Sequence, residues 1–261
     1  MIDNEQAALV LRAFREVQIE MGLDPAPGKT VFPVLSESLE HLRGLPENAL
    51  LFGLAADSMP VLLHLRDPRP GPVLVVGERG CGKTAFLKVL MQGAEQLAGP
   101  SGTRFVVLSD YPSEFDDIGP SESLLEVRAP YEPESADLLY ELACTVQNPQ
   151  SDQVLVLLFD GLQSILQMEP SARENLAYIL LNGPQALVWP IVTINAEMAL
   201  HMPEWLAFFR TRIYGRIADP RAINELTPLP GAPLNSLFPG SQFCLRQNSA
   251  WMKFWLPSLS G

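Results

Sequence analysis

An octapeptide rich in glycine, GERGCGKT at residues 77–84, constrains the fold of this chain more than any other feature of the sequence. It follows the apolar run at residues 73–76 and precedes a helical pattern over residues 83–97. Glycines let backbone N–H groups curl around phosphate oxygens, a lysine neutralises the phosphate charge, and a hydroxyl holds magnesium. A strand, such a loop and a helix in this order predict a nucleotide-binding loop of the Walker A type.

The whole loop is expected to bind ATP. The predicted contacts are Gly77, Glu78, Arg79, Gly80, Cys81, Gly82, Lys83, Thr84 and Ala85. Two interpretations of Cys81 stay open, a small filler residue or a redox-sensitive thiol near a helix N-terminus. A second GKT at residues 28–30 lacks the upstream glycine and the preceding strand, so we expect an ordinary loop there.

Short apolar runs alternate with helical patterns through most of the chain. The runs span residues 73–76, 105–108, 124–127, 154–159 and 191–194. Strands that alternate with helices predict a mainly parallel sheet between helical layers. The expected fold class is therefore α/β, a three-layer P-loop NTPase (RecA-like) sandwich. Ser171 and Glu174 predict a capping box for a helix that Gly183 closes.

The pattern also divides the chain. Residues 3–21 carry apolar side chains at three- and four-residue steps, as in an amphipathic helix, and a second short helical pattern runs from Leu35 to Leu45. We expect residues 1–47 to form a short helical extension and residues 48–261 to form the nucleotide-binding domain.

Composition and charge exclude several classes of function. The net charge of −12 argues against a broad basic surface that would follow a nucleic-acid backbone. The chain has no apolar stretch long enough for a membrane span, and its first residues lack the features of a secretory signal. Its three cysteines lie far apart, so neither a disulfide framework nor a zinc site is expected. A cytoplasmic setting is predicted.

The apolar run at residues 154–159 ends in Asp160, as a Walker B strand does. Asp160 is expected to hold magnesium together with Thr84, although an aspartate that caps the next turn is the plainer alternative. Many ATPases place a glutamate directly after this aspartate, where it activates the attacking water, but the next residue here is Gly161. Asp110 is the best substitute and Glu114 the next. A solvated acidic loop is the alternative for both.

Residues 52–257 resemble the FtsK and HerA group of P-loop motors, especially FtsK-type ATPase domains. The resemblance rests on the loop, on the Asp160 strand and on IVTINA at residues 191–196 followed by TRI at residues 211–213. These last stretches are similar to the family's A-T-Q-R-P strand and its later T-R-I. The order continues through residues 231–232, 237 and 239–240 to a closing strand pattern at residues 251–256.

The resemblance also exposes departures. Ile194 stands where the family has a glutamine that senses the γ-phosphate, Asn195 where it has an arginine, and Gly161 where it has the catalytic glutamate. Asn195 could still donate a hydrogen bond to the γ-phosphate or the water, or could satisfy a turn. Arg212 matches the arginine of the T-R-I motif, which implies a contact with nucleotide or with a neighbouring subunit. Pairing with surface acids is the alternative.

The function that the resemblance implies is that of an ATP- and magnesium-binding protein with a low ATPase rate. It implies a role in DNA or protein translocation, within a homo-oligomeric ring or a larger motor assembly, and the charge gives nucleic acid no support. One alternative is a nucleotide-binding regulatory or structural module that does not hydrolyse. The other is a P-loop kinase for small molecules, which would need an arginine-rich lid over the donor phosphates.

Overall fold

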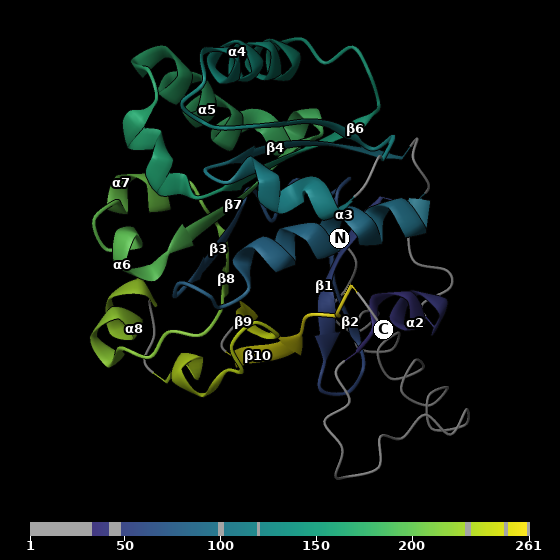
Figure 1. Cartoon of the computed structure of the whole chain (residues 1–261), viewed down its shortest axis with the longest axis vertical. Helices are drawn as coiled ribbons and strands as arrows, with labels where there is room; N and C mark the ends of the chain where they lie inside the picture. Colours follow the sequence, from purple (N-terminus) through teal and green to yellow (C-terminus); the bar gives the residue numbers. More distant parts are fainter. Residues whose placement is uncertain are drawn as a thin grey trace. The chain divides into compact units, whose positions relative to one another are not determined.

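The computed structural model describes residues 33–41, 48–98, 102–118, 121–227, 231–247 and 250–259 (Figure 1). The helix predicted at residues 3–21 and the second GKT lie outside these residues. The chain divides into two compact units, residues 1–31 and residues 32–261. All described residues belong to the second unit. The domain boundary expected after residue 47 stays a prediction.

A ten-stranded sheet forms the frame of the second unit. From one edge to the other its strands are β2 (Pro60–His64), β1 (Ala49–Ala55), β10 (Ala250–Trp255), β9 (Gln242–Gln247), β8 (Thr211–Tyr214), β3 (Val73–Gly77), β7 (Val188–Asn195), β6 (Val154–Asp160), β4 (Thr103–Ser109) and β5 (Leu124–Arg128). The six strands from β8 to β5 pair in parallel, and the other four pair antiparallel. The predicted mainly parallel sheet is confirmed.

Helices cover both faces of this sheet (Figure 1). The described helical segments are α2 (Leu35–His41), α3 (Lys83–Ala98), η1 (Pro112–Ile118), α4 (Pro133–Gln147), η2 (Leu162–Gln167), α5 (Pro170–Asn182), η3 (Gly183–Ala186), α6 (Ala196–Ala199), α7 (Pro203–Leu206), α8 (Pro220–Leu226) and η4 (Leu234–Ser236). None of the helices in the described part of the chain is both long and apolar enough to cross a membrane.

Alternate side chains of β3 face two separate apolar cores. Leu74 and Val76 belong to the core that includes buried residues of α4 and α5, whereas Val73 and Val75 belong to the core that includes α3. Because a strand turns successive side chains to opposite faces, a sheet covered on both sides needs continuous apolar runs. This is the predicted three-layer arrangement.

The start of α5 differs from the prediction. The helix begins at Pro170, its N-cap is Glu169, and no side chain caps it. Ser171 therefore lies inside the first turn, and the capping box that we predicted from Ser171 and Glu174 is wrong. Proline is favoured at the first helical position because its fixed φ suits the helix. A backbone N–H at this position would have no acceptor within the helix, so its absence costs nothing. The predicted end is right, since Gly183 is the C-cap.

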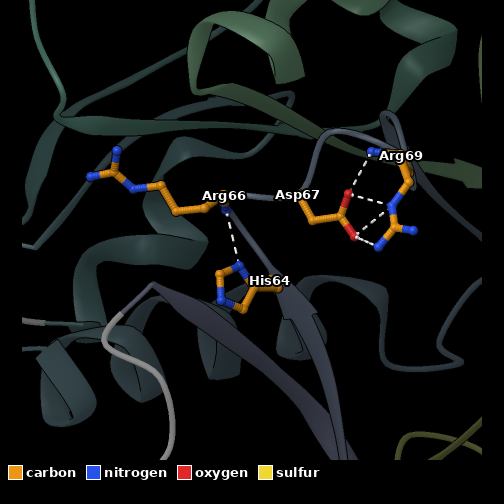
Figure 2. A network of polar contacts seen from close by, with 4 residues as sticks. All are labelled: His64, Arg66, Asp67 and Arg69. Carbon is orange, nitrogen blue, oxygen red and sulfur yellow. Dashed lines mark hydrogen bonds and ion pairs between the residues drawn. The ribbon is translucent and has the colours of Figure 1, made fainter. Parts of the chain in front are cut away.

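The turn between β2 and β3 leads the chain into the strand that carries the phosphate loop (Figure 2). In this turn the guanidinium of Arg69 donates to both carboxylate oxygens of Asp67, from Nε at 2.8 Å and from a terminal nitrogen at 2.7 Å. These hydrogen bonds hold the pKa of Asp67 at about 2, below its ordinary value of 3.8. The backbone N–H of Arg66 donates to Nδ1 of His64. The turn is also bonded to β7, because Nε1 of Trp189 donates to the carbonyl of Leu65.

We predict that Asp67→Asn removes a pH-dependent part of the stability. A carboxylate whose pKa is lowered by folding stabilises the folded state above its ordinary pKa, and this contribution is lost as the pH falls through the lowered value. The melting temperature of the wild type should therefore exceed that of Asp67→Asn near neutral pH. The difference should vanish as the pH falls from about 4 to about 2. A difference that grows with acidity would contradict the prediction.

Candidate functional site

The carboxyl ends of β3, β4, β6 and β7 surround a cavity of about 540 Å³. Register explains the meeting point, because Ser109 of β4 lies beside Asp160 of β6, and Asp160 lies beside Thr193 of β7. Nine of the predicted site residues line the cavity: Arg79, Gly80, Gly82, Lys83, Thr84, Ala85, Asp110, Asp160 and Asn195. Five other residues complete the lining: Tyr111, Glu114, Gly161, Gln163 and Thr193.

The loop before α3 has the backbone of a phosphate cradle. Gly80 and Gly82 have φ values of +79° and +95°, which residues with a side chain rarely adopt. A Cβ on Gly82 would also lie 2.8 Å from the carbonyl oxygen of Gly240. The N–H of Gly240 in turn donates to the carbonyl of Cys81, at 3.2 Å. The segment at Gly240 thus supports the loop from behind and requires glycine at residue 82.

Lys83 folds back onto the loop. Its Nζ donates to the carbonyls of Gly77, at 3.1 Å, and Glu78, at 2.8 Å. Both acceptors are neutral, whereas a phosphate oxygen carries negative charge and adds Coulomb attraction to the hydrogen bond from an ammonium. The ammonium is therefore placed to exchange a carbonyl for a phosphate oxygen.

The carboxylate of Asp160 connects two elements of the site. One oxygen accepts from the hydroxyl of Thr84, at 2.7 Å, and the other accepts from the hydroxyl of Thr193, at 2.6 Å. The backbone N–H of Gly161 then donates to the Thr193 hydroxyl, at 3.0 Å. Thr84 and Asp160, which were predicted to share a metal, are thus adjacent. Thr193 was not predicted as a site residue, although a hydroxyl within an otherwise apolar buried strand was the available signal.

Gly161 adopts a backbone conformation that disfavours any residue with a side chain. Its φ is +108°, and a Cβ there would lie 2.7 Å from Nε2 of Gln163 and 3.3 Å from a carboxylate oxygen of Asp110. Asp110 accepts hydrogen bonds from the hydroxyl of Ser164 and from the Gln163 amide. The side chains of Asp110 and Gln163 therefore occupy the space into which a side chain at residue 161 would project. Asp110 lines the cavity and is partly buried.

Four predicted site residues, Gly77, Glu78, Cys81 and Arg212, lie outside this cavity's lining. The carboxylate of Glu78 accepts from the N–H of Ala218 and lies 3.8 Å from a guanidinium nitrogen of Arg216. Cys81 is buried, and burial raises the pKa of its thiol, which favours the filler interpretation over a reactive thiol. Gly77 ends β3 beside Asn195. Ile194, which replaces the family's sensor glutamine, is fully buried in the apolar core.

Arg212 lines a second cavity, of about 450 Å³, on strands β8, β9 and β10. Three arginines (Arg210, Arg212 and Arg246) share this cavity with Tyr214 and Trp251, whose rings meet edge to face at 5.8 Å. Arg212 donates to the carbonyl of Leu206, at 2.8 Å. Among the described residues, none of the three arginines lies within ion-pair distance of a carboxylate. Pairing with surface acids is thus seen for Arg216 and not for Arg212.

We predict that Gly161→Glu does not restore the usual hydrolytic glutamate. Forcing a residue with a side chain into this conformation costs about 1 to 3 kcal/mol, and the new side chain would displace Gln163 and Asp110. The variant should unfold at lower denaturant concentration and should release phosphate no faster than the wild type. Gly161→Ala separates backbone strain from the effect of the carboxylate. Faster phosphate release from a stable Gly161→Glu protein would contradict the prediction.

Comparison with known proteins shows the fold of the chain. No protein-family model and no curated protein matches its sequence. Among solved structures it is similar to Thermomonospora curvata EccC (ATPases 2 and 3, in complex with a signal sequence peptide), with a TM-score of 0.67, 14% identity, and coverage of 90% of this chain and 44% of that one. EssC (ATPases 2 and 3) from Geobacillus thermodenitrificans gives a TM-score of 0.66 and 15% identity, over 98% of this chain and 50% of that one.

A third similar structure is the monomer form of the pCW3 conjugation coupling protein TcpA with ATPγS. Its TM-score is 0.59 and its identity 14%, over 88% of this chain and 70% of TcpA. The chain therefore spans about half the length of the EccC and EssC chains that it matches. The expected resemblance to FtsK-type P-loop ATPase domains is confirmed at the level of the fold, which this chain shares with the ATPase domains of EccC and EssC.

Proposed function

We propose that this chain binds ATP with magnesium, hydrolyses it slowly, and serves as one subunit of a translocation assembly. Proteins of the same fold include the Type VII secretion ATPase EccC and a conjugation coupling protein solved with ATPγS. The observation that carries the proposal is the convergence of Lys83, Thr84 and Asp160 on one cavity, beneath a loop with two left-handed glycines.

The residues at this cavity suit the parts of a nucleotide. Backbone N–H groups of the loop and the ammonium of Lys83 would hold the β- and γ-phosphates. The hydroxyl of Thr84 and the carboxylate of Asp160, 2.7 Å apart, are the oxygen donors that magnesium prefers, and they would hold it between them. When bound, magnesium neutralises phosphate charge. Asn195, which lines the cavity at the end of β7, would donate to the γ-phosphate or the attacking water.

A slow rate follows from what the site lacks. Gly161 has no carboxylate, and Ile194 is buried where the family senses the γ-phosphate. Asp110 lines the cavity and is the acid placed to accept the proton of the attacking water, in place of a carboxylate at residue 161. Binding with no hydrolysis is the second candidate, favoured by the same two substitutions.

The kinase alternative receives less support from the arrangement. A small-molecule kinase needs arginines above the donor phosphates. In the described part of the chain, Arg79 is the one arginine that lines the nucleotide cavity, whereas Arg210, Arg212 and Arg246 share the second cavity. Arginines without carboxylate partners on a separate face suit contact with another subunit. We therefore assign Arg212 to stabilising phosphate charge in a neighbouring copy of the chain.

The first test is nucleotide binding by Lys83→Ala. Loss of the ammonium removes charged hydrogen bonds worth about 1.5 to 3 kcal/mol each, so affinity for magnesium-ATP should fall by about a hundredfold or more in calorimetry. Lys88→Ala is the matched control, because Lys88 lies on the same helix and pairs with Asp117 at 2.7 Å, outside the cavity. Unchanged affinity in Lys83→Ala would remove the central claim.

The second test is phosphate release by Arg212→Ala, with the solution mass measured under the same conditions. If Arg212 acts in a neighbouring copy, the variant should bind magnesium-ATP as the wild type does and release phosphate about a hundredfold more slowly. The rate of phosphate release per wild-type subunit should rise with protein concentration, because association of subunits would bring Arg212 to the neighbouring site.

Arg104→Ala is the control, since Arg104 lies on β4, and three strands separate β4 from β8. Equal rates in all three proteins would exclude Arg212 from hydrolysis. Adding double-stranded DNA separates a DNA cargo from other cargoes, because only a DNA motor would release phosphate faster with DNA.

A further inference from the structure

The amide of Gln163 is the unusual group beside the nucleotide cavity. Gln163 lies on η2, two residues after Gly161, and lines the cavity. Its Nε2 donates to a carboxylate oxygen of Asp110 at 3.5 Å, near the upper limit for a hydrogen bond. Because a carboxylate only accepts, the amide must present its NH₂ group to Asp110. Oε1 then points elsewhere, where it is buried without a hydrogen-bond partner among the described residues.

A buried acceptor without a partner is energetically costly. Leaving such a group unsatisfied destabilises the folded state, and most buried polar groups in proteins are paired. The long bond to Asp110 is weak and compensates little of this cost. The side chain therefore gains most from a rearrangement that gives Oε1 a donor, and the cavity wall to which Gln163 belongs is where a bound water would supply one.

The conformation of Gly161 keeps this place free for Gln163. A Cβ at residue 161 would lie 2.7 Å from Nε2 of Gln163. The glutamate that many ATPases carry at this position would thus compete with the Gln163 amide for one space. The chain has glycine there, together with an amide and the carboxylate of Asp110 from a neighbouring strand end. The side chains of Gln163 and Asp110 thus occupy the space that a glutamate side chain at residue 161 would fill.

We propose that Gln163 is a positioning residue that turns toward bound ATP and holds the attacking water for Asp110. Oε1 accepts one proton of the water in a hydrogen bond, and the Asp110 carboxylate accepts the other proton in the reaction. The water oxygen bonds to the γ-phosphorus, the bond from that phosphorus to the β,γ-bridging oxygen breaks, and the products are ADP and phosphate. Ser164 fixes Asp110 through its hydroxyl. The proposal rests on the proposed nucleotide binding and names how that site activates water.

The test compares Gln163→Leu with the wild type. Leucine is close to glutamine in size and lacks both polar atoms, so magnesium-ATP should bind with unchanged affinity. The kcat for phosphate release should fall by about tenfold or more, because small misplacements of a reacting group cost up to about a hundredfold. Affinity for ADP with aluminium fluoride, which imitates the γ-phosphoryl group in flight, should fall as well. Affinity for ADP alone should not change.

Gln167→Leu is the matched control, because Gln167 belongs to the same short helix and is exposed. Melting temperatures of both variants show whether each is folded. A Gln163→Leu protein that is folded, binds ATP and keeps the wild-type kcat and aluminium fluoride affinity overturns the proposal. A wild type that binds ATP without releasing phosphate overturns it too. A wild type that does not bind ATP refutes the proposed function itself.

Discussion

The hydrogen bonds of the Asp160 carboxylate hold the candidate site together. They run from Thr84, at the start of α3, through Asp160, at the end of β6, to Thr193 on β7. The geometry exists because β3, β6 and β7 are parallel and end within two residues of one another, with Asp160 beside Thr193 and Gly77 beside Asn195. A carboxylate with both oxygens bonded has little freedom to move. The same sheet therefore sets the positions of the glycine-rich loop and of the two groups proposed to hold magnesium.

Gly161 links this rigid arrangement to the chemistry. Its left-handed backbone lets the chain leave β6 while its N–H still donates to Thr193. The same conformation removes the direct route to a catalytic glutamate and leaves the space to Asp110 and Gln163. The left-handed backbone at Gly161 thus disfavours a side chain at this residue and leaves the adjacent space to the Gln163 amide and the Asp110 carboxylate. Any hydrolysis of nucleotide at this site would depend on Asp110, which follows β4, and Gln163, which lies on η2.

Charge is distributed unevenly over the described structure. The chain carries a net charge of −12, yet Arg210, Arg212 and Arg246 share a cavity in which none of them pairs with a carboxylate. Arg212 and Arg246 lie on adjacent antiparallel strands, one step along from the pair of Ile213 and Leu245. Like charges opposite each other on a sheet are destabilising. An anionic group from outside would offset this repulsion, which suits the role proposed for Arg212.

By itself, the sequence predicted five of the six parallel strands, the glycine-rich loop between β3 and α3 and the carboxylate at the end of β6, because these depend on local composition and on burial of both sheet faces. It did not reveal the antiparallel hairpin of β1 and β2, although the sequences ALLFGLA and PVLLH are mostly apolar, nor strand β9, whose sequence QFCLRQ mixes polar and apolar residues. Thr193 was missed and Arg212 proved to lie outside the nucleotide cavity because the neighbours of a strand residue are set by register, which spacing along the chain does not encode. Gln163 and Ser164 lie on η2 and were missed because their contacts with Asp110 join segments that are far apart in the sequence. Only the tertiary structure placed Gln163 and Asp110 in the space beside Gly161, because that contact needs the end of β4, the end of β6 and the turn of η2 together.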